Sequence, residues 1–234
     1  MAGSSGTLAK AYLDVLNSEQ SETVYGIDKV APQEKPLFNF FQCDLTSESE
    51  VAAVAAKIVS DEKNELTLVN FAGRISNAPV FTLEKNNIKD LSVLEWEKDF
   101  IDVFWPVLVP TLSFAKICAR VGTPLHVVQI SSVSSRGIAG QSAYSAGKAA
   151  IEAVSNSLAK ELGGMGVRMN SLRVGYTDTP GFLQNVSTSR IADYRSRTGI
   201  GRFARPEEVA TAIQGMRSSG YLSGAIIHLD GAFD

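Results

Sequence analysis

The sequence predicts an α/β fold in which one doubly wound parallel sheet forms a single domain over residues 1–234. Short β-branched or aliphatic runs alternate along the chain with longer segments of helical periodicity, and this alternation is typical of a parallel sheet covered by helices on both faces. The 234 residues, 44% of them hydrophobic and 20% charged, are enough for one complete core. No internal repeat, low-complexity tract or linker divides the chain.

Six runs are expected to form strands, because each is short, apolar and flanked by turn residues. They are residues 23–28, 37–44, 66–73, 125–132, 167–175 and 224–231. Five segments with helical periodicity fill the gaps. They are residues 7–18, 48–62, 91–121, 143–164 and 205–219. Pro206 and the two glutamates after it suit the first turn of the last helix, where a carboxylate meets the positive end of the helix dipole.

Composition excludes several classes of function. The net charge of −3 and the lack of a Lys/Arg cluster argue against nucleic acid as a partner. No apolar run approaches the roughly 20 residues that cross a bilayer, and the N-terminus lacks the layout of a signal peptide, so we expect a cytoplasmic protein without membrane contact. No metal site is expected either, because Cys43 and Cys118 have no C-x-x-C spacing and both histidines lie in strand-like runs.

The segment AGSSG at residues 2–6 has the composition of a glycine-rich turn between a first strand and the first helix, although an ordinary turn has the same composition. If it is the glycine-rich turn, its backbone N–H groups face the pyrophosphate of a dinucleotide. Only Met1 precedes the turn, so the first strand is expected to be missing or truncated, which leaves a gap of roughly two strand spacings of about 4.8 Å. Residues upstream of Met1 supply the strand, another segment fills the slot, or the neighbouring strands close up; the sequence leaves all three open.

Asp28 ends the next predicted strand, about 20 residues after the glycine-rich turn. A carboxylate there can accept hydrogen bonds from both adenosine ribose hydroxyls, and it would repel a 2′-phosphate. NAD is therefore expected rather than NADP. The plainer alternative is that Asp28 starts a turn with Lys29.

Seven short motifs follow along the chain. They are CDLTS with Asp44, NFAG at 70–73, ISSVSS with Ser132, YSAGK with Tyr144 and Lys148, RVGYTDTP with Gly175 and Thr179, GRFARPEEVA, and LDGAFD. In order and approximate spacing they resemble the short-chain dehydrogenase/reductase family, and the resemblance covers residues 2–233. Phe71 stands where the family has a second asparagine, and Val174 replaces its proline.

The resemblance implies a Rossmann-like fold, an NAD(P)-dependent oxidoreductase that acts on CH–OH or C=O groups of a small molecule, and assembly as a homodimer or homotetramer. It implies a catalytic triad in which Ser132 binds the substrate oxygen, Tyr144 exchanges a proton with it, and Lys148 lowers the tyrosine pKa and holds the nicotinamide ribose. The residues then expected to bind the cofactor are Gly3, Ser5, Gly6, Thr7, Asp28, Asp44, Leu45, Asn70, Ala72, Gly73, Tyr144, Lys148, Gly175, Thr177 and Thr179.

Elementary electrostatics supports a link between the tyrosine and the lysine. Tyr144 and Lys148 are four residues apart, so they project from one face of a helix. At about 4 Å and an effective dielectric near 20, the attraction between phenolate and ammonium is about 4 kcal/mol. That energy would lower the tyrosine pKa by roughly three units at most, close to neutrality. Each of these residues also has a plain structural interpretation. Tyr144 and Lys148 could form the edge of an amphipathic helix, and Ser132 could cap the end of a strand.

Two departures from the family pattern concern the cofactor and the proton path. In the G-x-x-x-G-x-G turn of the family, the first and third glycines correspond to Ala2 and Leu8, and a leucine there is expected to crowd the pyrophosphate or shift the first helix. An asparagine that helps hold a relay water in the family corresponds to Val103 or Phe104. Neither side chain can perform that role.

Substrate identity is weakly encoded. A lid-like segment, residues 182–202, carries Arg190, Arg195, Arg197 and Arg202, which either receive an anionic substrate or, as we favour, form a solvated helix face. Residues 74–95 either shape the pocket or form a surface excursion. Two functions therefore remain: an NAD-dependent oxidoreductase, or a protein of the same fold that binds dinucleotide weakly or not at all and acts as a cofactor-independent catalyst or a binding or regulatory protein.

Overall fold

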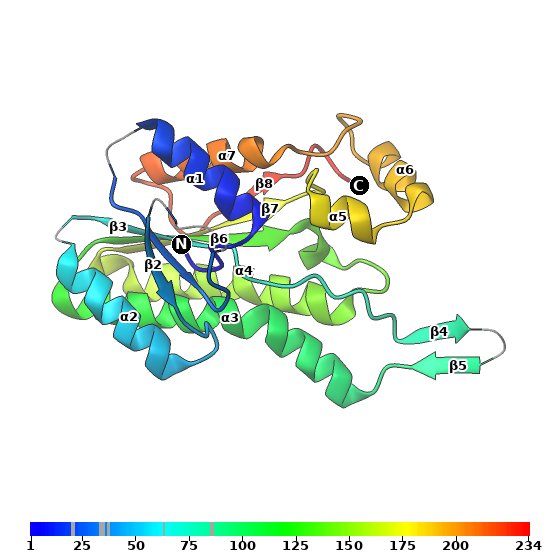
Figure 1. Cartoon of the computed structure of the whole chain (residues 1–234), viewed down its shortest axis with the longest axis horizontal. Coiled ribbons are helices and arrows are strands. Elements are labelled where there is room, and N and C mark those ends of the chain that lie inside the picture. The colour runs from blue at the N-terminus through cyan, green and yellow to red at the C-terminus, as the bar shows by residue number, and fades with distance from the viewer. Residues whose placement is uncertain (20–21, 33–35, 37, 63, 85–86) are drawn as a thin grey trace.

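The computed structural model describes residues 1–19, 22–32, 36, 38–62, 64–84 and 87–234. A sheet lies between two groups of helices (Figure 1). The helices are α1 (Thr7–Glu19), α2 (Glu48–Asp61), α3 (Val93–Val121), α4 (Ser142–Leu162), α5 (Pro180–Asn185), α6 (Thr188–Ser196) and α7 (Pro206–Ser218). The strands are β1 (Tyr25–Asp28), β2 (Asn39–Gln42), β3 (Leu66–Asn70), β4 (Phe81–Glu84), β5 (Asn87–Asp90), β6 (Leu125–Ser132), β7 (Val167–Val174) and β8 (Ile226–Leu229).

The six strands and five long helices predicted from the sequence are confirmed. The helix boundaries agree within two residues, and all but one of the strands are shorter than predicted. Capping side chains explain the sharp starts: Ser47 accepts a hydrogen bond from the amide of Glu50, and Ser92 and Glu95 form a reciprocal capping box. Gly122, in the left-handed region, ends α3.

Helices cover both faces of the sheet. On one face α1 packs against α7, and on the other α3 packs between α2 and α4. Each interface holds a separate apolar core. The core beneath α2, α3 and α4 includes Val51, Phe114, Cys118 and Ile151, whereas the core beneath α1 and α7 includes Tyr12, Leu172 and Ile213.

The sheet has two halves that meet at the N-terminus. β1 pairs in parallel with β2, and β3, β6, β7 and β8 form a second parallel group in that order. Ala2 bridges both halves, opposite Ile27 on one side and Asn70 on the other. Residues 1–3 lie at one end of the slot between these halves, and β1 and β3 do not pair with each other in the part of the chain that the structure describes.

Four backbone hydrogen bonds make this junction. The Ala2 amide donates to the Val69 carbonyl at 3.0 Å, and the Phe71 amide donates to the Ala2 carbonyl at 2.9 Å. On the other side, the Gly3 amide donates to the Ile27 carbonyl at 2.9 Å, and the Ile27 amide donates to the Met1 carbonyl at 2.9 Å. The glycine-rich turn is thereby held at the carboxyl ends of the neighbouring strands.

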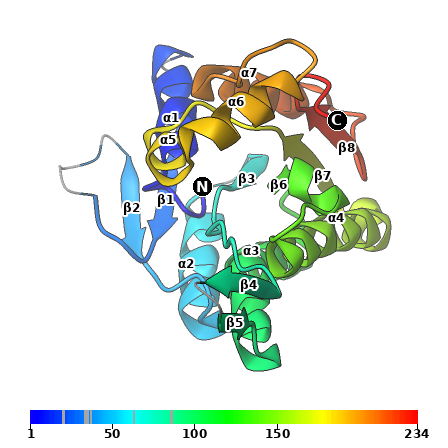
Figure 2. The same ribbon diagram turned by 90° about the vertical axis from the view of Figure 1, so that its right-hand side faces the viewer.

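The β4–β5 hairpin was not expected from the sequence, whereas a helix within residues 182–202 was favoured. Within residues 74–95, β4 and β5 form an antiparallel hairpin that projects from the body of the molecule (Figure 1). The segment after β7 forms two short helices, α5 and α6. Viewed from the right-hand side of Figure 1, α5 and α6 lie on the α1 and α7 side of the molecule and the hairpin lies on the α3 side (Figure 2).

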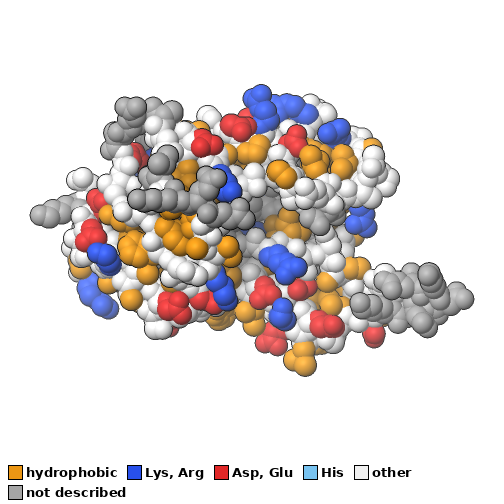
Figure 3. Space-filling view, viewed as in Figure 1, with side chains coloured by type: hydrophobic (Ala, Val, Ile, Leu, Met, Phe, Trp, Pro, Cys, Tyr) orange, Lys and Arg blue, Asp and Glu red, His pale blue; other side chains and the backbone are white. Residues whose placement is uncertain are grey.

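Helix α3 has 29 residues and by length and composition alone could cross a membrane. Here it is a layer of the fold, because Val103, Val107, Phe114 and Cys118 are buried along it. On the face drawn in Figure 3, acidic and basic side chains are interspersed rather than gathered by sign.

Gly147 brings α4 close to α3. A Cβ atom on Gly147 would lie 2.8 Å from Cγ1 of Val103, a side chain with no exposed surface. Gly147 immediately precedes Lys148 and lies one turn from Tyr144, so this close approach sets the position of both side chains relative to the sheet.

Gly147→Ala is expected to lower the free energy of unfolding by about 1–3 kcal/mol, the usual effect of overpacking. Val103→Ala also removes stability on its own, but in the double variant the new methyl group occupies space that the valine leaves. The combined loss measured by denaturant unfolding should therefore be smaller than the sum of the two. If the losses in free energy of unfolding are strictly additive, the side chains at positions 103 and 147 are not in steric contact.

Candidate active site

Tyr144, Lys148 and Ser132 meet at the carboxyl edge of the sheet. Lys148 Nζ lies 5.8 Å from the centroid of the Tyr144 ring, so the pair shares one face of α4 as the spacing predicts. Ser132, the last residue of β6, lies beside the Tyr144 side chain and acts to lower its pKa. The tyrosine is 7% exposed and the lysine 4% exposed, so both are shielded from water, whereas Ser132 is half-buried.

The ammonium group of Lys148 is fixed by the backbone. Nζ donates a hydrogen bond to the carbonyl oxygen of Ile130 at 2.8 Å. Burial lowers the lysine pKa to about 8, against a smaller opposing effect of the Glu152 carboxylate. At pH 7 most of the Lys148 side chains in a population therefore carry a positive charge.

Burial is also the main influence on Tyr144. It raises the phenol pKa to about 12, while the hydrogen bond with Ser132 acts in the opposite direction. The expectation of a pKa near neutrality is wrong for this structure. Lys148 Nζ lies toward the ring and bonds the Ile130 carbonyl, so its charge does not offset the loss of water around the phenol oxygen.

Glycines shape the space where a dinucleotide would lie. Gly3 has φ +76°, and a Cβ there would lie 2.6 Å from the amide nitrogen of Ala72, so only glycine lets the turn at residues 3–6 approach the segment after β3. A Cβ on Gly73 would lie 3.3 Å from Lys148 Nζ. The two predicted cofactor segments are thus adjacent, the second leads to Lys148, and this cradle fits a dinucleotide.

Thr7 begins α1 directly after the turn, so amide groups of the helix N-terminus face the same region. Leu8, at the position of the third glycine of the family turn, is half-buried and packs against the core beneath α1 and α7. The leucine is therefore accommodated below the helix, and α1 keeps its predicted start.

Asp28 ends β1 beside the glycine-rich turn. Its Oδ2 accepts a hydrogen bond from the Ser5 amide at 3.0 Å, and its Oδ1 accepts one from the Val30 amide at 3.0 Å. Because an ionised carboxylate has about four acceptor positions, these bonds orient the group and leave capacity for ribose hydroxyls. The turn interpretation of Asp28 and the cofactor interpretation are compatible.

Asp44 is an ion-paired residue in a small polar recess. Its Oδ2 lies 2.8 Å from Lys29 Nζ and its Oδ1 accepts hydrogen bonds from Thr46, and the Lys29 contact is the largest of the effects that lower its pKa to about 2. The recess has a volume of about 210 Å³ and is also lined by Glu50. The next residue, Leu45, is part of the core beneath α2, α3 and α4.

The Asn70 side chain is directed into the core. It has no exposed surface, and its Nδ2 donates to Thr111 Oγ1 at 3.0 Å and to Gln129 Oε1 at 2.8 Å. Thr111 in turn donates to the Val107 carbonyl. The amide therefore ties β3 to β6 and α3, so a contact with a cofactor would have to come from the backbone of residues 70–73.

The segment after β7 crosses close to the C-terminal strand. A Cβ on Gly175 would lie 2.8 Å from the Cα of Asp230, so glycine is required for this approach. Thr177 is buried and bridges Ala204, and Thr179 caps α5 by accepting a hydrogen bond from the Phe182 amide. These three predicted cofactor residues therefore lie in the connection between β7 and the lid-like segment.

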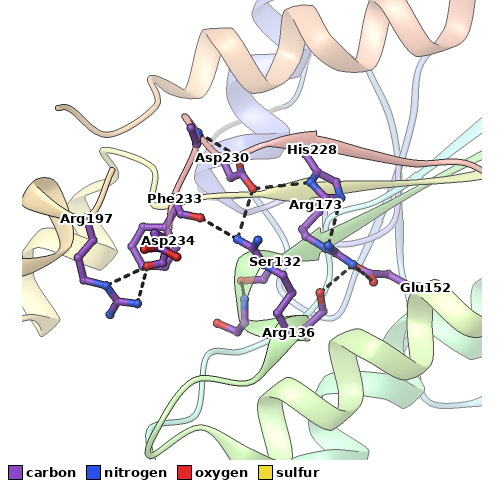
Figure 4. A network of polar contacts seen from close by, with 12 residues as sticks. Ser132, Arg136, Glu152, Arg173, Arg197, His228, Asp230, Phe233 and Asp234 are labelled. Carbon is purple, nitrogen blue, oxygen red and sulfur yellow. Dashed lines mark hydrogen bonds and ion pairs between the residues drawn. The ribbon is translucent and has the colours of Figure 1, made fainter. Parts of the chain in front are cut away.

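A polar network behind the triad was not predicted from the sequence. Glu152 continues the stripe of Tyr144 and Lys148 by one further turn of α4, and its carboxylate binds Arg173 through Nε at 3.0 Å and Nη2 at 2.6 Å (Figure 4). Its Oε1 also accepts hydrogen bonds from two serine hydroxyls. The sequence signal that could have predicted this contact is the four-residue spacing between Lys148 and Glu152, which places both on one face of α4.

Figure 4 shows how this network reaches the C-terminal residues. Arg173 lies 3.1 Å from His228 Nε2, and Arg136 donates to the Phe233 carbonyl at 2.9 Å and lies 3.6 Å from the Asp230 carboxylate. Among the described residues, no group of three His, Cys, Asp or Glu side chains is arranged to hold a metal ion.

The lid-like segment packs through an aromatic cluster that the sequence did not reveal. Its members are Tyr176, Phe182, Tyr194, Phe203 and Phe233. Arg195 lies over Phe203, Arg197 lies over Phe233, and Arg202 pairs with Glu208. Three of the four arginines considered for an anionic substrate therefore contact this chain instead.

Val103 and Phe104 bear on the proton path. Val103 is fully buried against Gly147, and Phe104 stacks with Phe100 at a ring separation of 5.4 Å. Neither offers a polar atom from its side chain behind Lys148. A water held there by a side-chain amide at this position is excluded.

Comparison with known proteins places the chain among dehydrogenases and reductases. A family model described as Enoyl-(Acyl carrier protein) reductase matches residues 7–233. The chain is 31% identical over 193 residues to the cis-4-hydroxycyclohexanecarboxylate dehydrogenase of Sinomonas cyclohexanicum, covering 81% of this chain and 74% of that protein. It is 29% identical over 228 residues to the 3-oxoacyl-[acyl-carrier-protein] reductase FabG of Thermotoga maritima, covering 97% and 85% respectively.

Solved structures share the fold at low sequence identity. A 4-hydroxyisoleucine dehydrogenase complexed with NADH superposes with a TM-score of 0.82 at 19% identity, covering 98% of this chain and 95% of that one. A short-chain dehydrogenase from Leptospira borgpetersenii with bound NAD⁺ superposes with a TM-score of 0.84 at 20% identity, covering 99% and 90%.

Glu152→Gln is expected to lower the free energy of unfolding by about 3 kcal/mol, because it leaves the Arg173 guanidinium buried without its charge partner. Replacing both residues, Glu152→Met with Arg173→Met, removes both charges and should recover most of that loss. Denaturant unfolding at pH 7 measures both effects.

The same pair gives a pH dependence. Burial raises the Glu152 pKa, but the hydrogen bonds from Arg173, Ser131 and Ser135 outweigh it, and the net pKa is lowered. The stability difference between wild type and Glu152→Gln should be complete above the unfolded-state pKa of about 4.3 and should vanish as the pH falls through the lower folded-state value. A difference that stays constant down to pH 2 would contradict this assignment.

Proposed function

Because the chain belongs to the short-chain dehydrogenase/reductase family, whose members act on CH–OH and C=O groups, we propose that it transfers a hydride between NAD(H) and a hydroxyl or ketone carbon of a small molecule. The observation that carries the proposal is the convergence of Ser132, Tyr144 and Lys148 beside a glycine cradle that leads to the lysine. The bound dinucleotide supplies or accepts the hydride.

Tyr144 is the proton carrier of the proposed site. With its pKa raised to about 12 by burial, the phenol is neutral at pH 7 and is ready to donate its proton to a carbonyl oxygen. That protonation state suits the reduction direction. Ser132, which lies beside the phenol, is placed to donate a second hydrogen bond to the carbonyl oxygen.

Lys148 attracts the phenolate that remains after proton transfer, although this attraction does not outweigh the effect of burial on the phenol pKa. Its charged Nζ is held by the Ile130 carbonyl and cannot swing away, so a positive charge persists near the ring. Val103 has no polar side chain, so α3 offers no side-chain amide at this position to help return a proton to Tyr144. The proton must come through other groups.

We further propose NAD(H) rather than NADP(H). Asp28 lies at the end of β1 beside the phosphate turn, where its ionised carboxylate, oriented by Ser5 and Val30, repels a 2′-phosphate. The cofactor-independent alternative is not favoured. Leu8, one of the residues that raised it, packs against the core rather than into the turn.

Tyr144→Phe should lower the rate of NADH-dependent ketone reduction by about 10²–10⁴-fold, the usual contribution of a general acid. NADH affinity, measured by fluorescence titration, should stay within about twofold. Tyr221→Phe is the matched control, because that ring is fully exposed at 103% and should change neither quantity. Retention of the wild-type rate in Tyr144→Phe would remove this tyrosine from its role.

Asp28→Asn should reduce the preference for NADH over NADPH by on the order of tenfold, about 1.4 kcal/mol, because the charge that repels the 2′-phosphate is gone. Fluorescence titration with both dinucleotides gives the two dissociation constants. Asp61→Asn is the control, since it removes an exposed carboxylate at the C-terminal end of α2 and should leave the ratio unchanged. Absence of saturable binding of either dinucleotide to wild type at millimolar concentration would end the oxidoreductase proposal.

A further inference from the structure

The Ser132 hydroxyl takes its direction from the short 3₁₀ helix that follows it. Ser132 ends β6 with extended backbone angles, φ −145° and ψ 153°, and η1 (Val133–Arg136) begins at the next residue. Its Oγ accepts a hydrogen bond from the Ser134 amide of η1 at 3.2 Å. Because this bond turns a lone pair toward η1, the hydroxyl hydrogen is left to donate elsewhere, and its direction depends on how η1 is held.

One carboxylate oxygen holds the chain on both sides of Ser132. Glu152 Oε1 accepts a hydrogen bond from the Ser131 hydroxyl at 2.7 Å and another from the Ser135 hydroxyl at 2.9 Å. Ser131 belongs to β6 and Ser135 to η1, whereas Glu152 lies on α4. These two contacts, called the serine clamp below, therefore fix the end of the strand and the 3₁₀ helix after it to the helix that carries Tyr144.

Arg173 of β7 keeps the carboxylate in place. It donates to Glu152 Oε1 through Nε at 3.0 Å and to Oε2 through Nη2 at 2.6 Å (Figure 4). The two side chains are 12% and 7% exposed, so hydrogen bonds to these charges are strong. With the two serine hydroxyls, four hydrogen bonds use the acceptor capacity of an ionised carboxylate, which is about four positions. The carboxylate cannot rotate without losing at least one of them.

A second contact ties η1 to the start of α4. Ser134 Oγ donates to Gln141 Oε1 at 2.8 Å, and Gln141 is the residue before α4. This contact does not involve Ser135. Loss of the Ser135 hydroxyl is therefore expected to loosen η1 and redirect the Ser132 hydroxyl without unfolding the segment.

We propose that Glu152 is a positioning residue that sets the direction of the Ser132 hydroxyl through the serine clamp. With Ser131 and Ser135 both held, Ser132 donates toward the phenol oxygen of Tyr144 and toward a substrate oxygen beside it. The part that concerns the substrate rests on the proposed function. Glu152 lies two turns of α4 beyond Tyr144, so it acts through the serines and not on the reacting atoms.

The test is an NMR measurement on the protein without dinucleotide, labelled with ¹³C at the ζ carbon of tyrosine. The Tyr144 resonance, assigned by its absence in Tyr144→Phe, reports whether a hydroxyl donates to the phenol oxygen. Ser132→Ala gives the position of this resonance without that donor. Replacing Ser131 and Ser135 together by alanine should move the resonance most of the way to the same position. Ser157→Ala, at an exposed serine of α4, is the matched control and should leave it unchanged.

Three further variants separate positioning from a general loss of structure. Ser135→Thr keeps the hydroxyl and should leave the Tyr144 resonance at its wild-type position. Adding Ser135→Ala to Ser132→Ala should cause no further displacement, because no donor is left to be misdirected. Glu152→Met with Arg173→Met removes the carboxylate without leaving a lone buried charge, and it should displace the resonance in the same direction as the two alanines.

Two results would overturn the proposal. One is a Tyr144 resonance that stays at its wild-type position when Ser131 and Ser135 are both alanine. The other is a displacement by Ser135→Ala that is equally large when Ser132 is already alanine, since the clamp would then act on the tyrosine by another route. Circular dichroism confirms that each variant is folded.

A kinetic measurement extends the test to the reaction. With NADH and cyclohexanone as the probe ketone, Ser135→Ala should lower kcat by about 3–10-fold, because a misdirected donor supports the transition state less well. KM for NADH should stay within about twofold. An unchanged kcat in an active enzyme would overturn the part of the proposal that concerns the substrate. A wild type that neither binds NADH nor reduces the ketone would count against the proposed function alone, because the NMR displacements are measured without dinucleotide.

Discussion

Within the described residues, the two halves of the sheet are joined where residues 1–3 hydrogen-bond to both of them. Ala2 pairs with Ile27 on one side and with Asn70 on the other, and Gly3 leads directly into the glycine-rich turn. The position of the turn relative to the segment after β3 therefore depends on these few bonds. Because Gly3 can approach Ala72 only without a side chain, the same junction determines the cradle in which the proposed cofactor lies.

Burial determines the chemistry of the site. Removing Tyr144 and Lys148 from water favours the neutral form of each, so the phenol pKa rises and the ammonium pKa falls. The lysine keeps a charge at neutral pH because the Ile130 carbonyl accepts its hydrogen bond and Glu152 lies one turn away. Glu152 in turn is held by Arg173, so an ion pair behind the triad supports the charge within it.

The C-terminal residues connect this ion pair to the lid-like segment. Arg136 binds the Phe233 carbonyl, and Phe233 packs against Tyr176 in the aromatic cluster. Arg197, which follows α6, donates to the Asp234 carbonyl at 2.9 Å. The lid-like segment is therefore linked through hydrogen bonds and ring contacts to the polar groups behind Lys148. A substitution in the segment is expected to affect these groups, and the reverse.

The sequence by itself determined the six strands of the main sheet, the five long helices and the convergence of Tyr144 with Lys148, because these depend on periodicity and on four-residue spacing within single elements. The β4–β5 hairpin and the aromatic cluster arise from contacts between distant segments that leave no local pattern. The tyrosine pKa was mispredicted for the same reason: the loss of water around Tyr144 comes from the packing of several elements, and no pair of residues encodes it. Only the tertiary structure showed that Ala2 pairs with both β1 and β3, because this contact joins segments that are distant in the sequence.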